Sequence, residues 1–174
     1  AAAPLDEPLR RLARDYPGPY PTNLYGETLH AAMAHQVTSL VKARDPAADH
    51  VTVHSVVGES GQAMVELAKH SRDTTGITGR AYAAMLFETA AIVRLARRAR
   101  KTFGVRVLVL THGETDAMNP TYGDELVRFA DDANRDLAAL TGQSERIVVF
   151  LSQQFGYPSS VGERPLVNQP QWRI

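Results

Sequence analysis

The chain has 174 residues, of which 44% are hydrophobic and 22% are charged, a composition typical of one globular domain with a sizeable core. Nineteen basic and nineteen acidic residues leave no net charge, which argues against a nucleic-acid-binding surface. The sequence has no cysteine, which excludes disulfides, thiolate metal sites and a cysteine nucleophile, and it has no apolar run long enough to span a bilayer.

Residues 1–24 are predicted to be a proline-rich extension of a single domain that covers residues 1–174. Prolines fix φ and remove backbone donors, so residues 16–21 (Tyr-Pro-Gly-Pro-Tyr-Pro) indicate a surface loop or a linker. The start at Ala1 without methionine fits a processed secreted protein or a proteolytic fragment, and the end at Ile174 suggests truncation. A secreted or cell-envelope location is compatible with this start.

Four helices are predicted where apolar residues recur at helical spacing, and they cover residues 28–43, 62–69, 82–103 and 122–140. Asp45 and Pro46 should end the first helix, and Gly104 and Gly142 should follow the ends of the third and fourth. Five cations near the end of the third helix favour a solvated helix terminus over a nucleic-acid patch: Arg94, Arg97, Arg98, Arg100 and Lys101.

Three strands are predicted. Residues 51–57 are rich in β-branched valine, whereas residues 105–110 and 147–151 are almost wholly aliphatic. Strands of the second kind are typical of a parallel sheet that is buried on both faces. The alternation of strands and helices predicts an α/β fold with right-handed βαβ crossovers and a parallel sheet covered by helices.

Polar segments follow the three predicted strands, at residues 58–62, 112–116 and 152–154. In open α/β sheets, ligands bind beyond the carboxyl ends of the strands. In the first segment, Gly58 and Gly61 let backbone N–H groups face an anion or an oxyanion, although two glycines can also simply make a turn. Ser60 resembles the serine of a G-x-S-x-G elbow, but the last position of that motif is Gln62, so Ser60 is a minor candidate nucleophile.

The second segment places His112, Glu114 and Asp116 directly after an aliphatic strand. Acids at such a place need hydrogen bonds or ion pairs, and they can serve only to cap turns and tie loops together. Because no metal-ligand spacing such as H-E-x-x-H occurs, neither a metal site nor another cofactor is predicted.

Residues 56–62 (Val-Val-Gly-Glu-Ser-Gly-Gln) and 111–117 (Thr-His-Gly-Glu-Thr-Asp-Ala) resemble two conserved blocks of the SGNH hydrolase superfamily, in its sialate O-acetylesterase-like branch. The first is similar to the block whose Ser-Gly step carries an oxyanion-hole glycine. The second is similar to a block written Q-G-E-S-D or H-G-E-S-D. The helix that ends in Leu-Thr-Gly-Gln at residues 140–143 also fits, so the resemblance covers residues 25–155.

The resemblance implies a three-layer, flavodoxin-like ester hydrolase that uses a Ser-His-Asp triad. Gly61 corresponds to the glycine of the oxyanion hole, and His112 is favoured over Glu114 as the side-chain donor, because an ionised carboxylate has no proton to donate. Glu114 would then orient the loop or fix the tautomer of His112. Gly58, Gln62 and Asp116 would contact the substrate, a small acylated molecule such as an acetylated sugar.

The nucleophile block G-D-S and the D-x-x-H block of the superfamily have no match in this sequence. The resemblance therefore implies an incomplete domain, with the triad serine and histidine on polypeptide outside this sequence or on a companion chain that completes the sheet. Two alternatives remain open: a non-catalytic module that binds a carbohydrate or a partner, and an unrelated hydrolase that uses Ser60.

Overall fold

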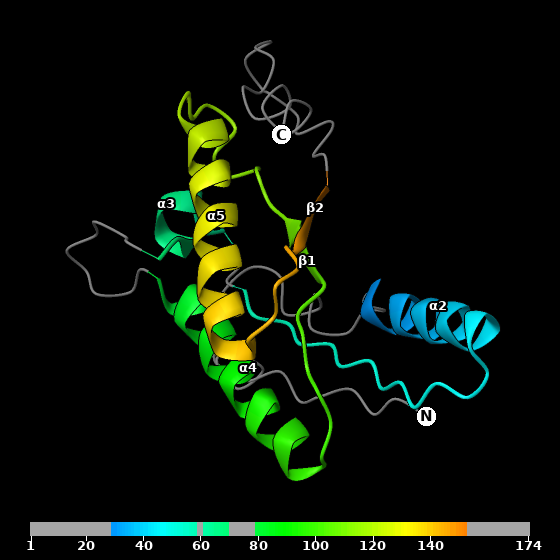
Figure 1. Cartoon of the computed structure of the whole chain (residues 1–174). Coiled ribbons are helices and arrows are strands. Elements are labelled where there is room, and N and C mark those ends of the chain that lie inside the picture. The colour runs from blue at the N-terminus through cyan, green and yellow to red at the C-terminus, as the bar shows by residue number, and fades with distance from the viewer. Residues whose placement is uncertain (1–28, 59–60, 70–78, 153–174) are drawn as a thin grey trace, which may run out of the picture. The chain divides into compact units, whose positions relative to one another are not determined.

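A computed structural model describes residues 29–58, 61–69 and 79–152 (Figure 1). The chain divides into two compact units, Ala1–Val57 and Gly58–Ile174. The predicted extension at residues 1–24 lies outside the described residues, as do Ser60 and the polar pair Gln153 and Gln154.

In the first unit, helix α2 (Leu29–Arg44) confirms the helix predicted for residues 28–43. It ends at Asp45 as predicted, because the carboxylate of Asp45 accepts a hydrogen bond from the Ala47 N–H at 3.0 Å and forms a turn. Ala34 is buried, but Leu40 on the predicted apolar face is 59% exposed.

The strand predicted for residues 51–57 is wrong for the structure, since these residues lie outside every helix and strand that is described. Val51 is 63% exposed and Val53 is 39% exposed. The β preference of valine reflects how well it fits a paired, half-buried sheet surface. Without a pairing partner, the β-branched run does not become a strand.

The second unit begins with the short helix α3 (Met64–Leu67), which is about half the length predicted from residues 62–69. The side chain of Glu66 accepts the Ala63 N–H at 2.7 Å at the start of α3, and Ala68 is already extended at its end. Gly79 has a φ of 74°, and a Cβ there would lie 3.3 Å from the Ala68 carbonyl oxygen. This close approach explains the glycine immediately before α4.

Helix α4 (Arg80–Arg98) buries one face through a set of residues at helical spacing: Ala81, Tyr82, Met85, Thr89 and Val93. Its predicted end near Gly104 is wrong, because the helix stops at Arg98 and Arg100 takes the left-handed conformation with a φ of 56°. Gly104 has a different reason to be glycine. The side chain of Gln143 reaches to within 3.2 Å of where a Cβ at Gly104 would lie, and it bonds both backbone groups of Val105.

Helix α5 (Tyr122–Thr141) confirms the fourth predicted helix, and Gly142 ends it with a φ of 78° as expected. Its buried residues recur along one face: Tyr122, Leu126, Phe129, Ala133 and Leu137. The rings of Phe129 and Tyr82 meet edge to face at 5.9 Å, so α4 and α5 pack against each other (Figure 1).

Strands β1 (Val107–Thr111) and β2 (Val148–Ser152) pair in parallel, and α5 is the crossover between them. This βαβ unit confirms the α/β class with a parallel sheet. The prediction that both strands are buried on both faces is wrong for the part of the chain that the structure describes. Val107 is 43% exposed, Val148 is 61% exposed and Phe150 is 62% exposed. A parallel sheet is buried on both faces only where helices cover both of them. The described sheet has two strands, and the exposure of Val107, Val148 and Phe150 shows that one of its faces is not fully covered.

Candidate functional site

The candidate site begins where β1 ends. His112 and Gly113 follow Thr111 directly, and Gly113 has a φ of 132°, which favours glycine. The chain then turns through residues 114–118 before α5 begins at Tyr122. The carboxyl end of a parallel strand is where α/β proteins place their ligand sites, so the second predicted segment lies at the expected edge.

His112 links this edge to the first predicted segment. Its Nε2 lies 2.9 Å from the carbonyl oxygen of Gln62, and its Nδ1 lies 3.1 Å from the hydroxyl of Tyr122. A carbonyl oxygen accepts only, so Nε2 must carry a proton and donate it to Gln62. Both ring nitrogens therefore bond within the protein, and the donor role predicted for His112 would require one of these bonds to be exchanged.

Asp116 holds the same segment at a second point. Its Oδ2 accepts the backbone N–H of Met64 at 2.6 Å, and this oxygen also lies 3.7 Å from Nε2 of His112. The side chains of His112 and Asp116 are 8% and 5% exposed, respectively. We call the pair of hydrogen bonds from His112 to Gln62 and from Met64 to Asp116 the α3 clamp. It joins segments that are 50 and 52 residues apart in the sequence.

The second oxygen of Asp116 is satisfied by the loop before α5. The side-chain amide of Asn119 donates to Asp116 at 2.8 Å and to Glu125 at 3.1 Å. The carbonyl of the same amide accepts the backbone N–H of Thr121 at 2.9 Å. A buried carboxylate with this many donors is held in one orientation. Asp116 therefore ties loops together. This is the structural role that the sequence analysis gave as the alternative to a substrate contact.

The opposite end of α3 is also anchored. Lys69, which follows α3, places its Nζ 2.6 Å from Oδ2 of Asp136 on α5, and the hydroxyl of Tyr82 donates to the same oxygen at 2.8 Å. Burial raises the pKa of Asp136, but the hydrogen bonds from Lys69 and Tyr82 outweigh it, so the pKa of Asp136 falls below its ordinary value. Burial and the hydrogen bond to Asp136 raise the pKa of Tyr82, which keeps its hydroxyl protonated.

The remaining predicted residues make none of the hydrogen bonds of the α3 clamp described above. Gly61, directly before Gln62, is exposed, has a φ of 77° and has open space where a Cβ would point. Gly58 is exposed, and a Cβ there would also meet nothing within 4 Å. Glu114 is exposed, and Nδ1 of His112 lies against the hydroxyl of Tyr122. The predicted role of Glu114, to orient the loop or fix the tautomer of His112, stays a prediction. Ser60 lies outside the described residues.

Sequence reasoning missed Tyr122, Asn119 and Glu125. Tyr122 was assigned to a helix, but its position as the first residue of α5, just beyond the loop that follows a strand, is the signal that could have found it. For Asn119, the signal is the Asn-Pro step between the acidic loop and the helix.

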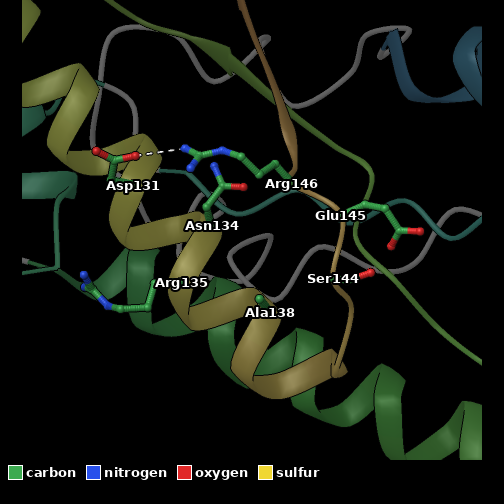
Figure 2. A pocket seen from close by; sticks show the side chains of 7 residues that line it. All are labelled: Asp131, Asn134, Arg135, Ala138, Ser144, Glu145 and Arg146. Atoms are coloured by element: carbon green, nitrogen blue, oxygen red, sulfur yellow. Dashed lines mark hydrogen bonds and ion pairs between the residues drawn. The ribbon is translucent and has the colours of Figure 1, made fainter.

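Among the described residues, no cluster of histidines and acids has the arrangement needed to hold a metal ion. None of the described helices combines the length and the apolar character needed to cross a membrane. Figure 2 shows a pocket on the later turns of α5 and the loop before β2, where Arg146 pairs with Asp131 at 3.0 Å. This pocket lies near the amino end of β2, whereas the α3 clamp lies at the carboxyl end of β1.

The described part of the second unit thus defines an α/β protein with a buried polar clamp at the carboxyl edge of a parallel sheet. Comparisons of the chain with protein-family models, with curated proteins and with solved structures gave no match.

Proposed function

We propose that this chain carries the oxyanion-hole part of an SGNH-type ester hydrolase that acts on small acylated substrates. One observation supports this most: the two segments that resemble superfamily blocks, 50 residues apart, meet through the α3 clamp at the carboxyl end of β1. Sequence order alone did not require their contact.

In the proposed reaction, a serine attacks the acyl carbonyl, its proton passes to a histidine, and negative charge develops on the carbonyl oxygen. The backbone N–H of Gly61 stabilises this oxyanion. Its exposure and its left-handed conformation make the backbone at this turn accessible to a ligand. His112 and Asp116 do not contact the oxyanion. They hold the turn in place through the carbonyl of Gln62 and the N–H of Met64. One such donor is worth roughly two to three orders of magnitude in rate.

The proposal includes the three-layer, flavodoxin-like architecture of the superfamily. The unit β1–α5–β2 is the repeating element of such a fold. Further strands and the triad serine and histidine would come from polypeptide outside the described residues or from a companion chain. An acetylated sugar is the proposed substrate, and a secreted or envelope location suits it.

The test compares two glycine variants in the purified protein together with every chain that copurifies. Gly61→Ala should lower the turnover of p-nitrophenyl acetate by about 100-fold, because alanine disfavours a φ of 77° and turns the backbone away. Gly142→Ala is the matched control, since its φ of 78° gives an alanine the same strain and its Cβ also enters open space, but it lies at the end of α5 away from the proposed site. Equal turnover in both variants would contradict the role of Gly61.

A fluorophosphonate probe with peptide mapping locates the nucleophile. Label on a serine other than Ser60 supports the proposal. Label on Ser60 would replace the oxyanion-hole role of this segment with a nucleophilic one.

A second candidate function is a binding module without catalysis. It is favoured by the hydrogen bonds on both ring nitrogens of His112, which leave this histidine engaged in holding the fold. Absence of both turnover and probe label, together with binding of an acetylated sugar in calorimetry, would establish this second function.

A further inference from the structure

Tyr122 contacts His112 through two kinds of interaction. Its side chain is completely buried, and its hydroxyl lies 3.1 Å from Nδ1 of His112. The two rings also stack, with centroids 5.6 Å apart and planes inclined by 19°. Tyr122 therefore touches the histidine both through a hydrogen bond and through its face.

The chemistry of the partners on the two sides of the imidazole determines which nitrogen carries the proton. The Gln62 carbonyl, 2.9 Å from Nε2, accepts only. A neutral imidazole that donates from Nε2 has a lone pair at Nδ1, and the hydroxyl of Tyr122 is placed to donate to it. The opposite tautomer would set the Nε2 lone pair against the Gln62 oxygen and break the α3 clamp.

We infer that Tyr122 is a positioning residue, which holds His112 in the Nε2–H tautomer and thereby fixes the backbone turn at Gly61. As the first residue of α5, Tyr122 stands on a helix anchored by buried Leu126 and Phe129. This gives the hydroxyl a fixed place relative to the end of β1. The consequence for catalysis rests on the proposed function, whereas the tautomer does not.

Nitrogen-15 NMR of the His112 ring tests the inference directly, because the two tautomers have different shifts at Nδ1 and Nε2. The unaltered protein should show the Nε2–H form. Tyr122→Phe should produce a mixture of tautomers and speed hydrogen exchange at the Met64 amide by about tenfold. An Nδ1–H form in the unaltered protein, or unchanged ring shifts in the variant, would overturn the inference.

Tyr82→Phe is the matched control, because Tyr82 is another buried tyrosine of the same unit and its hydroxyl bonds Asp136 instead of His112. This variant should leave the His112 shifts unchanged. Equal changes in both variants would mean that the loss of any buried hydroxyl loosens the unit, and would contradict a specific role for Tyr122.

A double variant separates the effect of the His112 tautomer from the effect of ring packing. Glutamine at position 112 can donate through its amide but has no tautomers, so in His112→Gln the further change Tyr122→Phe should not accelerate exchange at Met64. An undiminished acceleration would count against the inference. If Tyr122→Phe alters the ring shifts but the unaltered protein does not hydrolyse acyl esters, the proposed function fails and the positioning role stands. If esters are hydrolysed, kcat should fall in Tyr122→Phe while KM is unchanged.

Discussion

Asp136 is the residue at which α5, the start of α4 and the end of α3 are joined through side chains. Its carboxylate accepts from Tyr82 and Lys69, and its second oxygen lies 3.5 Å from Nε of Arg135. Burial raises the pKa of Asp136, but these hydrogen bonds and charges lower it by a larger amount. The folded protein therefore favours the ionised form. The stability of the folded state therefore depends on pH in part through this group.

We expect Asp136→Asn to weaken the dependence of folding stability on pH in acid. The pKa of Asp136 is lower in the folded state than in the unfolded state, where it is about 4. Its contribution is fully present above the unfolded value and is lost as pH falls through the folded value. Urea unfolding between pH 2 and pH 7 should show a shallower acid slope and a lower free energy of unfolding at pH 7 in the variant.

Asp131→Asn is the control for this measurement, because the ion pair of Asp131 with Arg146 is solvent-exposed and such pairs contribute about 0–1 kcal/mol. If both variants show the same acid slope, the clustered hydrogen bonds at Asp136 do not govern the acid response.

At the level of elements, the end of α4 departs from the usual use of glycine. The backbone N–H of Lys101 bonds the carbonyl of Ala96, and that of Arg100 bonds the carbonyl of Arg97, which together form a Schellman motif. The left-handed position of this motif usually holds glycine, but here it holds Arg100. The motif persists because its two backbone hydrogen bonds offset the steric penalty of a Cβ.

Arg100→Gly should therefore stabilise the protein by about 1 kcal/mol, because it removes the Cβ from a left-handed residue. Chemical denaturation would measure the gain as a higher midpoint with an unchanged slope. Gly142→Ala is the reciprocal control at the end of α5, where φ is 78° and the Cβ would meet open space, and it should lose a similar amount. A loss of stability in Arg100→Gly would show that the arginine side chain contributes more than its backbone strain costs.

The sequence predicts helices α2 and α5 well because each has local signals at its ends, Asp45 in one case and Gly142 in the other. The end of α4 was misassigned because Gly104 serves contact with Gln143, a partner 39 residues away that no local pattern reveals. The strand at residues 51–57 was misassigned because valine preference becomes a strand only when a neighbour supplies hydrogen bonds.

The candidate site shows the same division. The polar segments after the strands, and the choice of His112 and Asp116, follow from the rule that ligands gather at carboxyl ends. The particular partners do not. Whether His112 meets Glu114, Asp116 or Tyr122 depends on where α5 begins and how it packs, which is a property of tertiary structure.

On the scale of the whole molecule, the parallel sheet presents an apolar face. Val107 pairs with Val148 and Val109 pairs with Phe150, so these side chains share one face, and three of the four are exposed. Exposed apolar surface of this kind is uncommon on a sheet whose strands run in parallel. The proposed three-layer architecture would cover it.

Phe150→Ala in the complete protein tests that architecture. If further elements cover the face, the free energy of unfolding should fall by about 3 kcal/mol, the usual loss for a buried phenylalanine. Phe87→Ala on α4 is the matched control, because Phe87 is also exposed and should lose much less. A change below about 0.5 kcal/mol in Phe150→Ala would contradict a covering layer.

The α3 clamp also has an entropic consequence. Bringing Gln62 to His112 closes a loop of 50 residues. Almost all of the loss of conformational entropy occurs in this first closure. Once it has formed, the bond between Met64 and Asp116 closes only a short remaining segment on each side. The two hydrogen bonds should therefore form and break together, as one cooperative step, and the loss of either should release the whole turn that carries Gly61.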